Sequence, residues 1–215
     1  MDWTLTCAAC GAVDSPEGAK TVCACGQPWL VRYPDRAWSR LSPTGLGVGP
    51  GMWRYRAFLP ITATETPVSL GEGMTPLLAL DRAGRALGIT QLWLKDEGVN
   101  PTGSFKARGL AAAITRAALG GASRFTLPTA GNAGVAASAY AARAGLSVRV
   151  YAPESTPRTL LAQIRWFGGD LVLVPGHIGD CGKAARQFAA ETGATDLSTL
   201  REPYRIEGKK TLGLE

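Results

Sequence analysis

Apolar positions from Val68 onward alternate between short strand-like runs and longer helix-like stretches. Short β-prone apolar runs lie at 92–96, 125–127, 147–152 and 171–174. Stretches with apolar residues at helical spacing lie at 104–119, 132–143, 157–167 and 179–192. Strands that recur at this interval, with helices between them, predict an α/β fold with a parallel, doubly wound sheet.

Glycine and proline mark the ends of several predicted helices. Gly120-Gly121 ends the helix at 104–119, and Gly193 ends the helix at 179–192. Pro157 suits the first turn of its helix, with Thr156 as the expected cap. A further helix is predicted at 207–215.

The pattern before Val68 is different and divides into two parts. Residues 1–34 carry short β-prone stretches around paired cysteines, which indicates a small ribbon. Residues 35–67 are read as a linker and extended arm, because the Pro/Gly-rich stretch 42–51 cannot sustain regular structure. Beyond that stretch, Trp53, Tyr55 and Phe58 are expected to pack against the main body, residues 68–215.

The paired cysteines predict a structural zinc site. The four ligands would be Cys7, Cys10, Cys23 and Cys25. Gly11 and Gly26 follow the second cysteine of each pair and let the chain fold back around a tetrahedral metal. Disulfides are the weaker alternative in a reducing compartment, and Cys181 reads as a packed core thiol.

Composition restricts the class of protein further. The 215 residues are 46% hydrophobic and 19% charged, as expected of a globular protein. No apolar run reaches the roughly 20 residues that span a membrane, and the N-terminus lacks a signal-peptide profile. The net charge of +6 comes from scattered arginines, so nucleic acid is not the expected partner. We expect a cytoplasmic protein that binds a small anionic molecule.

The segment Gly98–Ala107 holds the strongest chemical signal. It places Lys106 just inside a helix, behind a turn of Asn100, Pro101 and Gly103. The helix dipole and partial burial lower a lysine pKa there, and imine chemistry requires the free amine. Backbone N–H groups and Ser104 would hold an anion. The alternative is a helix cap with a solvated lysine.

A second turn, Thr129–Gly134, joins the carboxyl end of a strand to a helix, where open α/β sheets bind ligands. Its small residues allow close approach of the helix. The turn lacks the Gly-x-Gly-x-x-Gly pattern of dinucleotide sites, which disfavours a nicotinamide cofactor.

Three ordered segments, 69–77, 98–107 and 128–134, resemble the tryptophan-synthase-β-like family of pyridoxal-phosphate enzymes, and within it the threonine synthases. The likeness covers residues 68–215 and implies that Lys106 binds pyridoxal phosphate as an imine. It also implies that Asn132 hydrogen-bonds the cofactor ring and that the Thr129–Ala133 turn holds the substrate carboxylate. The expected cofactor residues are Lys106, Phe105 and Asn132, and the expected substrate residues are Ser104, Thr129, Ala130, Asn132, Ala133 and Arg205.

The reaction implied by the resemblance converts O-phosphohomoserine and water to threonine and phosphate. Arg205 would meet the substrate phosphate, because guanidinium binds phosphate with two donors. A local role of Arg205, as a cap or in a pair with Glu202 or Glu207, is an equal alternative. The resemblance also supports the zinc ribbon, because relatives often carry a Cys-x-Cys-Gly-x-Pro knuckle, as in Cys23–Pro28.

Two departures keep other reactions open. Ala107 and Ala133 stand where many threonine synthases have Asp and Thr, so an amino-acid dehydratase or a sulfur-amino-acid synthase is an alternative. A zinc-ribbon binding module with a degenerate α/β domain is the non-enzyme alternative, and a redox role of the cysteines is a third. No glycine-rich cofactor-phosphate loop lies at 211–215, so we expect an N-terminal fragment that binds cofactor weakly or not at all. A homodimer is common among relatives, but the sequence leaves the oligomeric state open.

Overall fold

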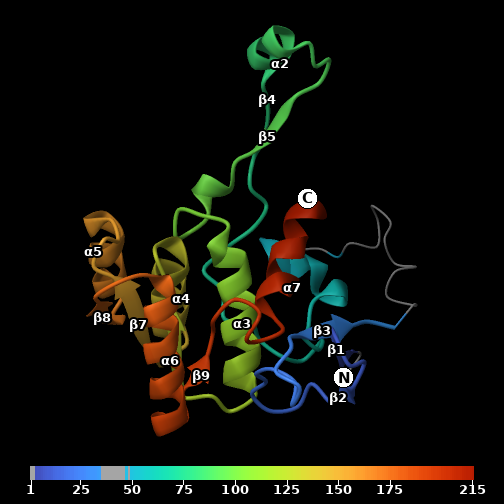
Figure 1. Cartoon of the computed structure of the whole chain (residues 1–215). Coiled ribbons are helices and arrows are strands. Elements are labelled where there is room, and N and C mark those ends of the chain that lie inside the picture. Colours follow the sequence, from blue (N-terminus) through green and yellow to red (C-terminus); the bar gives the residue numbers. More distant parts are fainter. Residues whose placement is uncertain (1–2, 35–46, 48) are drawn as a thin grey trace.

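Three separate sheets form the β-structure of the computed structural model, which describes residues 3–34, 47 and 49–215 (Figure 1). The largest is a parallel sheet of four strands in the order β8-β7-β6-β9. Its strands are β6 (Arg124–Pro128), β7 (Ser147–Pro153), β8 (Asp170–Val174) and β9 (Thr195–Asp196). The parallel sheet predicted from the sequence is thereby confirmed.

The chain enters this sheet at its middle and then reverses direction. It runs outward from β6 through β7 to β8, and then crosses back to β9 on the other side of β6. The carboxyl end of β6 therefore lies at a topological switch point, which is where open α/β sheets bind ligands. The turn at Thr129–Gly131 follows directly.

Helices cover both faces of the parallel sheet. They are α3 (Lys106–Leu119), α4 (Asn132–Arg143), α5 (Arg158–Trp166) and α6 (Ile178–Thr192). Val150 of β7 packs in one cluster with Ile164 of α5, whereas its neighbour Tyr151 packs with Cys181 and Ala185 of α6. Consecutive strand residues point to opposite faces, so α5 and α6 lie on opposite sides. Cys181 is fully buried, as predicted.

The helix ends follow the sequence signals with two exceptions. Gly193 ends α6 in the left-handed conformation, with a φ of 70°, and α3 ends at Gly120. Thr156 does not cap α5, because the extended Pro157 occupies the cap position and its carbonyl accepts from Leu160 N–H at 3.0 Å. The last helix is α7 (Arg205–Lys210), continued by a 3₁₀ turn, η3 (Thr211–Gly213), and it begins before the predicted residue 207. None of the described helices has the length and apolar character needed to cross a membrane.

A two-stranded arm projects from the body (Figure 1). It consists of β4 (Leu77–Ala79), α2 (Asp81–Leu87) and β5 (Trp93–Lys95), and its strands pair antiparallel. We expected residues 92–96 to form a strand of the parallel sheet. They do form a strand, β5, but it pairs with β4 in a separate antiparallel sheet, so the expected sheet was wrong. A short apolar run does not reveal which sheet it joins, and β4 and α2 were not predicted.

The N-terminal ribbon packs directly on α3. Its antiparallel strands are β1 (Thr4–Cys7), β2 (Val13–Asp14) and β3 (Trp29–Arg32). Leu5 belongs to the same buried cluster as Leu110 and Ile114, and the Arg116 guanidinium lies 5.1 Å from the centroid of the Trp3 ring. The ribbon therefore shares one hydrophobic core with the main body.

The residues between the ribbon and the main body include a short 3₁₀ helix, η1 (Met52–Phe58). Tyr55 and Phe58 are buried there, which confirms that this segment packs against the main body. Residues 35–46 and 48 of the predicted linker and arm, 35–67, lie outside the described residues.

Candidate active site

Lys106 is the first residue of α3 and follows a turn that begins at Asn100. Gly103 N–H donates to the Asn100 carbonyl at 2.8 Å, and the φ of Gly103 is 69°, which glycine adopts without steric penalty. The Ser104 hydroxyl accepts from the backbone N–H of Lys106 at 3.3 Å. The Lys106 Nζ lies 3.8 Å from the centroid of the Phe105 ring. The amine is thus half-buried against an aromatic face at a helix N-terminus.

The electrostatic environment of Lys106 favours its uncharged form. Partial burial lowers the pKa of Lys106, and the positive charges of Lys209 and Arg205 lower it further. The first turn of α3 contains no acidic residue. A lysine with a lowered pKa has more of the free amine that attacks a carbonyl carbon.

Asn100 connects the lysine turn to the segment before the arm. Its Oδ1 accepts from the backbone N–H of Gly73 at 3.1 Å. Its Nδ2 donates to the carbonyl of Glu97 at 2.9 Å and to Glu97 Oε2 at 3.0 Å. Asn100 is buried, so it fixes the turn and is not available to a ligand.

Glu72, a buried carboxylate, anchors the same segment to the body. It accepts from Trp53 Nε1 at 2.6 Å, from the Tyr140 hydroxyl at 2.7 Å and from Leu70 N–H at 2.9 Å. Residues 69–77 are thereby tied to η1 and to α4. The role of Glu72 was not predicted, because its partners are distant in the sequence.

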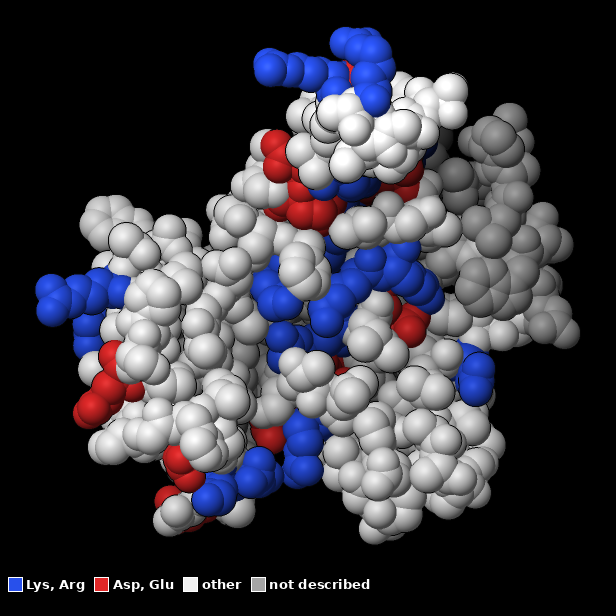
Figure 2. Space-filling view, turned by 45° about the horizontal axis from the view of Figure 1, so that its top comes forward, with Lys and Arg blue, Asp and Glu red and all other residues white. Residues whose placement is uncertain are grey.

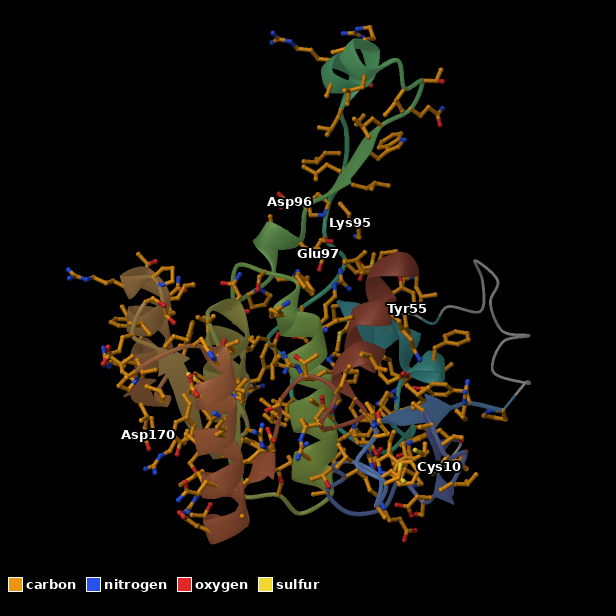
Figure 3. All side chains as sticks on the ribbon, in the orientation of Figure 1. Cys10, Tyr55, Lys95, Asp96, Glu97 and Asp170 are labelled. Atoms are coloured by element: carbon orange, nitrogen blue, oxygen red, sulfur yellow. The ribbon has the colours of Figure 1, made fainter. Side chains whose placement is uncertain are left out.

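Arg108 is the centre of a buried ionic network at the base of the arm. Its guanidinium is 0% exposed and contacts Glu97, in the 3₁₀ turn η2 (Glu97–Val99), through Nε and Nη2, both at 2.7 Å. It also pairs with Glu215, which accepts from Lys95 Nζ at 2.7 Å. Lys95, Asp96 and Glu97 lie together where the arm joins the body (Figure 3). Arg108 therefore holds the start of α3 to the base of the arm.

Thr129 organises the second turn from within. Its Oγ1 accepts from Gly131 N–H at 3.0 Å and Gly134 N–H at 3.1 Å, and it donates to the Gly131 carbonyl. The buried hydroxyl is therefore used by the turn itself. Ala130 and Asn132 are exposed, and Ala133 is half-buried. The side chain of Asn132 makes no hydrogen bond to any described residue, so its amide is free for a ligand.

The two turns lie at the same end of the molecule. Lys106 begins α3 and Asn132 begins α4, and both helices start at the end where β6 terminates (Figure 1). The predicted cofactor residues thus come from two neighbouring helix N-termini, whose N–H groups suit an anionic ligand.

Arg205 begins α7 and is 3% exposed. Its Nη1 donates to the carbonyl of Leu197 at 2.6 Å, and its Nε has no hydrogen-bond partner among the described residues. Glu202 accepts from the backbone N–H of Arg205 and not from its guanidinium. Glu207 pairs with Lys210. The local ion pair considered from the sequence is therefore absent from the described contacts.

Lys209 is a further basic residue of this site and was not predicted from the sequence. Its Nζ lies 5.9 Å from the centroid of the Phe105 ring, the ring that Lys106 also contacts. Lys106, Arg205 and Lys209 form what we call the cation cluster. Lysine and arginine side chains gather in the hollowed centre of one face, below the arm (Figure 2). The four-residue spacing from Arg205 was the available signal, because such residues share a helix face.

The four predicted metal ligands converge in the ribbon. The sulfur atoms of Cys7, Cys10, Cys23 and Cys25 all lie within 4.8 Å of one another. Cys7 and Cys25 are 3.4 Å apart, and Cys10 and Cys23 are 3.8 Å apart, without disulfide bonds. Hydrogen bonds from the backbone N–H groups of Cys10 and Ala9 lower the pKa of Cys7 to about 6. Cys10 lies within the ribbon in Figure 3.

Comparison with known proteins places the main body in a family. Residues 68–215 match the model of the family described as pyridoxal-phosphate dependent enzyme. The chain belongs to this family. The match contains Lys106, both turns and α7.

Curated relatives of this pyridoxal-phosphate family member include threonine synthases. That of Bacillus sp. (strain ULM1) is 39% identical over 163 residues, which are 75% of this chain and 46% of the relative. That of Methanocaldococcus jannaschii is 37% identical over 166 residues, which are 77% of this chain and 41% of the relative. The chain thus spans less than half the length of these relatives.

Solved structures share the fold of this family member. Threonine deaminase isoform 2 from Solanum lycopersicum superposes with a TM-score of 0.58 at 22% identity, over 65% of this chain and 38% of that protein. Diaminopropionate ammonia lyase from Escherichia coli, in complex with D-serine, has a TM-score of 0.61 at 22% identity, over 67% and 44%. These two similarities support the fold alone.

The residues around Lys106 fit pyridoxal phosphate chemically. The cofactor carries an aldehyde and an anionic phosphate, and the site offers a lysine with a lowered pKa beside two further cations. The exposed amide of Asn132 and the N-terminus of α4 add hydrogen-bond donors at the same end. The donor set therefore suits the cofactor that the family name states.

Proposed function

We propose that the whole protein is a lyase of the threonine synthase type, which converts O-phosphohomoserine and water to threonine and phosphate. The observation that carries this proposal is the placement of Lys106. Its half-buried amine lies at the start of α3 within the cation cluster. Similarity to threonine synthases across the same residues supports the choice of reaction.

We assign cofactor binding and proton transfer to residues of the two turns. Pyridoxal phosphate, when bound, supplies an electron sink for the substrate carbons. Lys106 would bind its aldehyde carbon and, once released, move protons at the α and β carbons of the substrate. Asn132 would donate to the cofactor ring oxygen, and Phe105 would lie beside the lysine amine.

Substrate recognition would come from the second turn and from α7. Backbone N–H groups of Ala130 and Ala133, with Thr129 holding the turn in shape, would bind the substrate carboxylate. Ser104 would add a hydroxyl at the lysine turn. Arg205 would bind the substrate phosphate, since its Nε lacks a described partner.

A structural zinc ion is the second part of the proposal. Four sulfurs at 2.3 Å from a tetrahedral zinc would be about 3.8 Å apart, close to the separations of 3.4 and 3.8 Å in the ribbon. Cysteines that remain free of disulfides also agree with the cytoplasmic location that we propose.

A phosphate-release assay on the full-length protein tests the proposed reaction. We expect stoichiometric release of phosphate from O-phosphohomoserine with formation of threonine. Lys106→Ala should abolish turnover, whereas Lys183→Ala, on the exposed surface of α6, should leave it unchanged. Pyruvate or 2-oxobutyrate formed from serine or threonine, without phosphate release from O-phosphohomoserine, would instead identify a dehydratase.

A further inference from the structure

Lys209 reaches the site across the surface of α3. Its Cε and Cγ atoms lie beside Gly109, where an added Cβ would be 3.3 Å and 3.5 Å away. The same added Cβ would lie 2.8 Å from the carbonyl oxygen of Arg205. The missing side chain at Gly109 therefore lets α7 approach α3 and lets the aliphatic part of Lys209 lie along the helix. Its amine then ends near the Phe105 ring, next to Lys106.

The cation cluster lacks a matching set of negative charges. Among the described residues, neither Lys106 nor Lys209 forms a salt bridge, and the Nη1 of Arg205 contacts only a carbonyl. The carboxylates that act on the cluster are Glu202 and Asp196. Glu202 is buried against the backbone N–H groups of Tyr204 and Arg205, and burial raises its pKa to about 7.

The other carboxylate, Asp196, has partners of its own. It accepts from the hydroxyl and the N–H of Ser198 and lies 3.6 Å from Arg201. The cation cluster is therefore left with an excess of positive charge. Like charges this close repel one another, so their placement costs free energy unless a bound anion compensates them.

We infer that Lys209 and Arg205 together form a subsite for a phosphate-type dianion beside Lys106, and that Lys209 selects substrates with a phosphate leaving group. This inference rests on the proposed function and adds to it a residue that determines specificity. Arg205 supplies an unpartnered buried Nε, and Lys209 supplies an ammonium from one turn further along α7.

The proposed role of Lys209 is a charge-assisted contact with the substrate phosphate and involves no covalent bond to the substrate. Two cations neutralise a phosphate dianion, whereas a neutral hydroxyl leaving group gains nothing from them. Substrates that differ only in phosphate and hydroxyl would then be distinguished at this subsite. Lys209 acts as a positioning residue, and proton transfer remains with Lys106.

The test uses the full-length protein with pyridoxal phosphate bound. It measures two constants, the inhibition constant of inorganic phosphate and the KM for O-phosphohomoserine. Lys209→Gln keeps most of the side-chain volume and removes the charge, so both constants should rise about tenfold or more, as expected for one lost charge-assisted contact. Lys209→Arg should restore them to within about threefold. Lys183→Gln removes an equal charge from the exposed surface of α6 and should change neither constant.

Two additional readouts separate the possible causes of failure. Thermal unfolding shows whether Lys209→Gln remains folded, and ³¹P NMR line broadening of inorganic phosphate reports binding without turnover. If wild-type protein releases no phosphate from O-phosphohomoserine but Lys209→Gln still weakens phosphate binding, the reaction assignment fails and the subsite stands. Unchanged inhibition and unchanged line broadening in folded Lys209→Gln would overturn the subsite.

Discussion

Arg108 and Glu215 form a bidentate ion pair, although they are 107 positions apart in the sequence. Nη1 donates to Oε1 at 2.6 Å, and Nη2 donates to Oε2 at 2.8 Å. The guanidinium is completely buried, and its other donors bind Glu97 and the hydroxyl of Thr211. This geometry fixes the first turn of α3, and therefore the position of Lys106, two residues earlier.

Replacing Arg108 by methionine should destabilise the protein strongly. The change leaves Glu97 without its cation and Glu215 with Lys95 alone, and the loss of one partner of a buried pair costs about 3–5 kcal/mol. Urea unfolding measures the difference. Arg149→Met is the control, because its pair with Asp170 is exposed and should contribute about 1 kcal/mol or less. Equal effects of the two changes would contradict this account of the network.

The same network should make the free energy of unfolding depend on pH. Burial opposes ionisation of Glu215, but hydrogen bonds from Arg108, Lys95 and Met74 outweigh it and lower its pKa from 4.5 to about 2. The unfolded chain therefore binds the proton first as the pH falls. The stabilisation, on the order of 3 kcal/mol, is present above pH 4.5 and is lost as the pH falls toward 2.

Urea midpoints at pH 6, 4 and 3 check this dependence. Wild-type protein should lose stability across the series, whereas Glu215→Gln should be less stable at pH 6 and change less with pH. Parallel curves for the two proteins would show that Glu215 is not the titrating group.

Gly208 permits the close contact between α7 and α3. A Cβ at this position would overlap the carbonyl oxygen of Arg108, which is backbone and cannot rotate away. Gly208→Ala should therefore cost about 1–3 kcal/mol, although alanine usually stabilises a helix. Gly182→Ala in α6 is the control, because its added methyl meets only the flexible end of Arg186 and should be neutral or stabilising. Thermal denaturation compares the two, and a stabilising Gly208→Ala would count against the packing described.

Removal of one predicted zinc ligand should release the metal and loosen the ribbon. Purified protein should contain zinc at one equivalent by elemental analysis, and Cys10→Ser should lose it and unfold at a lower temperature. Cys181→Ala removes a thiol far from the ribbon and should retain zinc. A wild-type protein that neither contains zinc nor takes it up would refute the metal site.

Local signals explain which parts of the fold were predictable. The helix at 132–143 and the strands β6, β7 and β8 follow apolar spacing and glycine stops, so their positions were predicted within about a residue or two. The two-residue strand β9 was not predicted. The turn before Lys106 was also predictable, because asparagine, proline and glycine have strong local preferences. These elements are encoded by neighbours in the sequence.

The remaining features depend on distant contacts. The partner of the strand at Trp93–Lys95 is decided by β4, which carries no strong signal of its own. The role of Arg108 was not predicted, since Glu97 and Glu215 become its partners only after folding. Lys209 gains its position from the contact of α7 with Gly109. Pairings of this kind are set by tertiary packing, which a periodic pattern does not encode.

The central claim is that Lys106, among the lysines of this chain, carries the reactive amine. Incubation of the purified protein with pyridoxal phosphate, borohydride reduction and peptide mass spectrometry will show which lysine is labelled. The account predicts that the pyridoxyl group is found predominantly on Lys106, and that Lys106→Ala abolishes this label while Lys183→Ala does not. Labelling spread over the exposed lysines, with Lys106 unmodified, would contradict it.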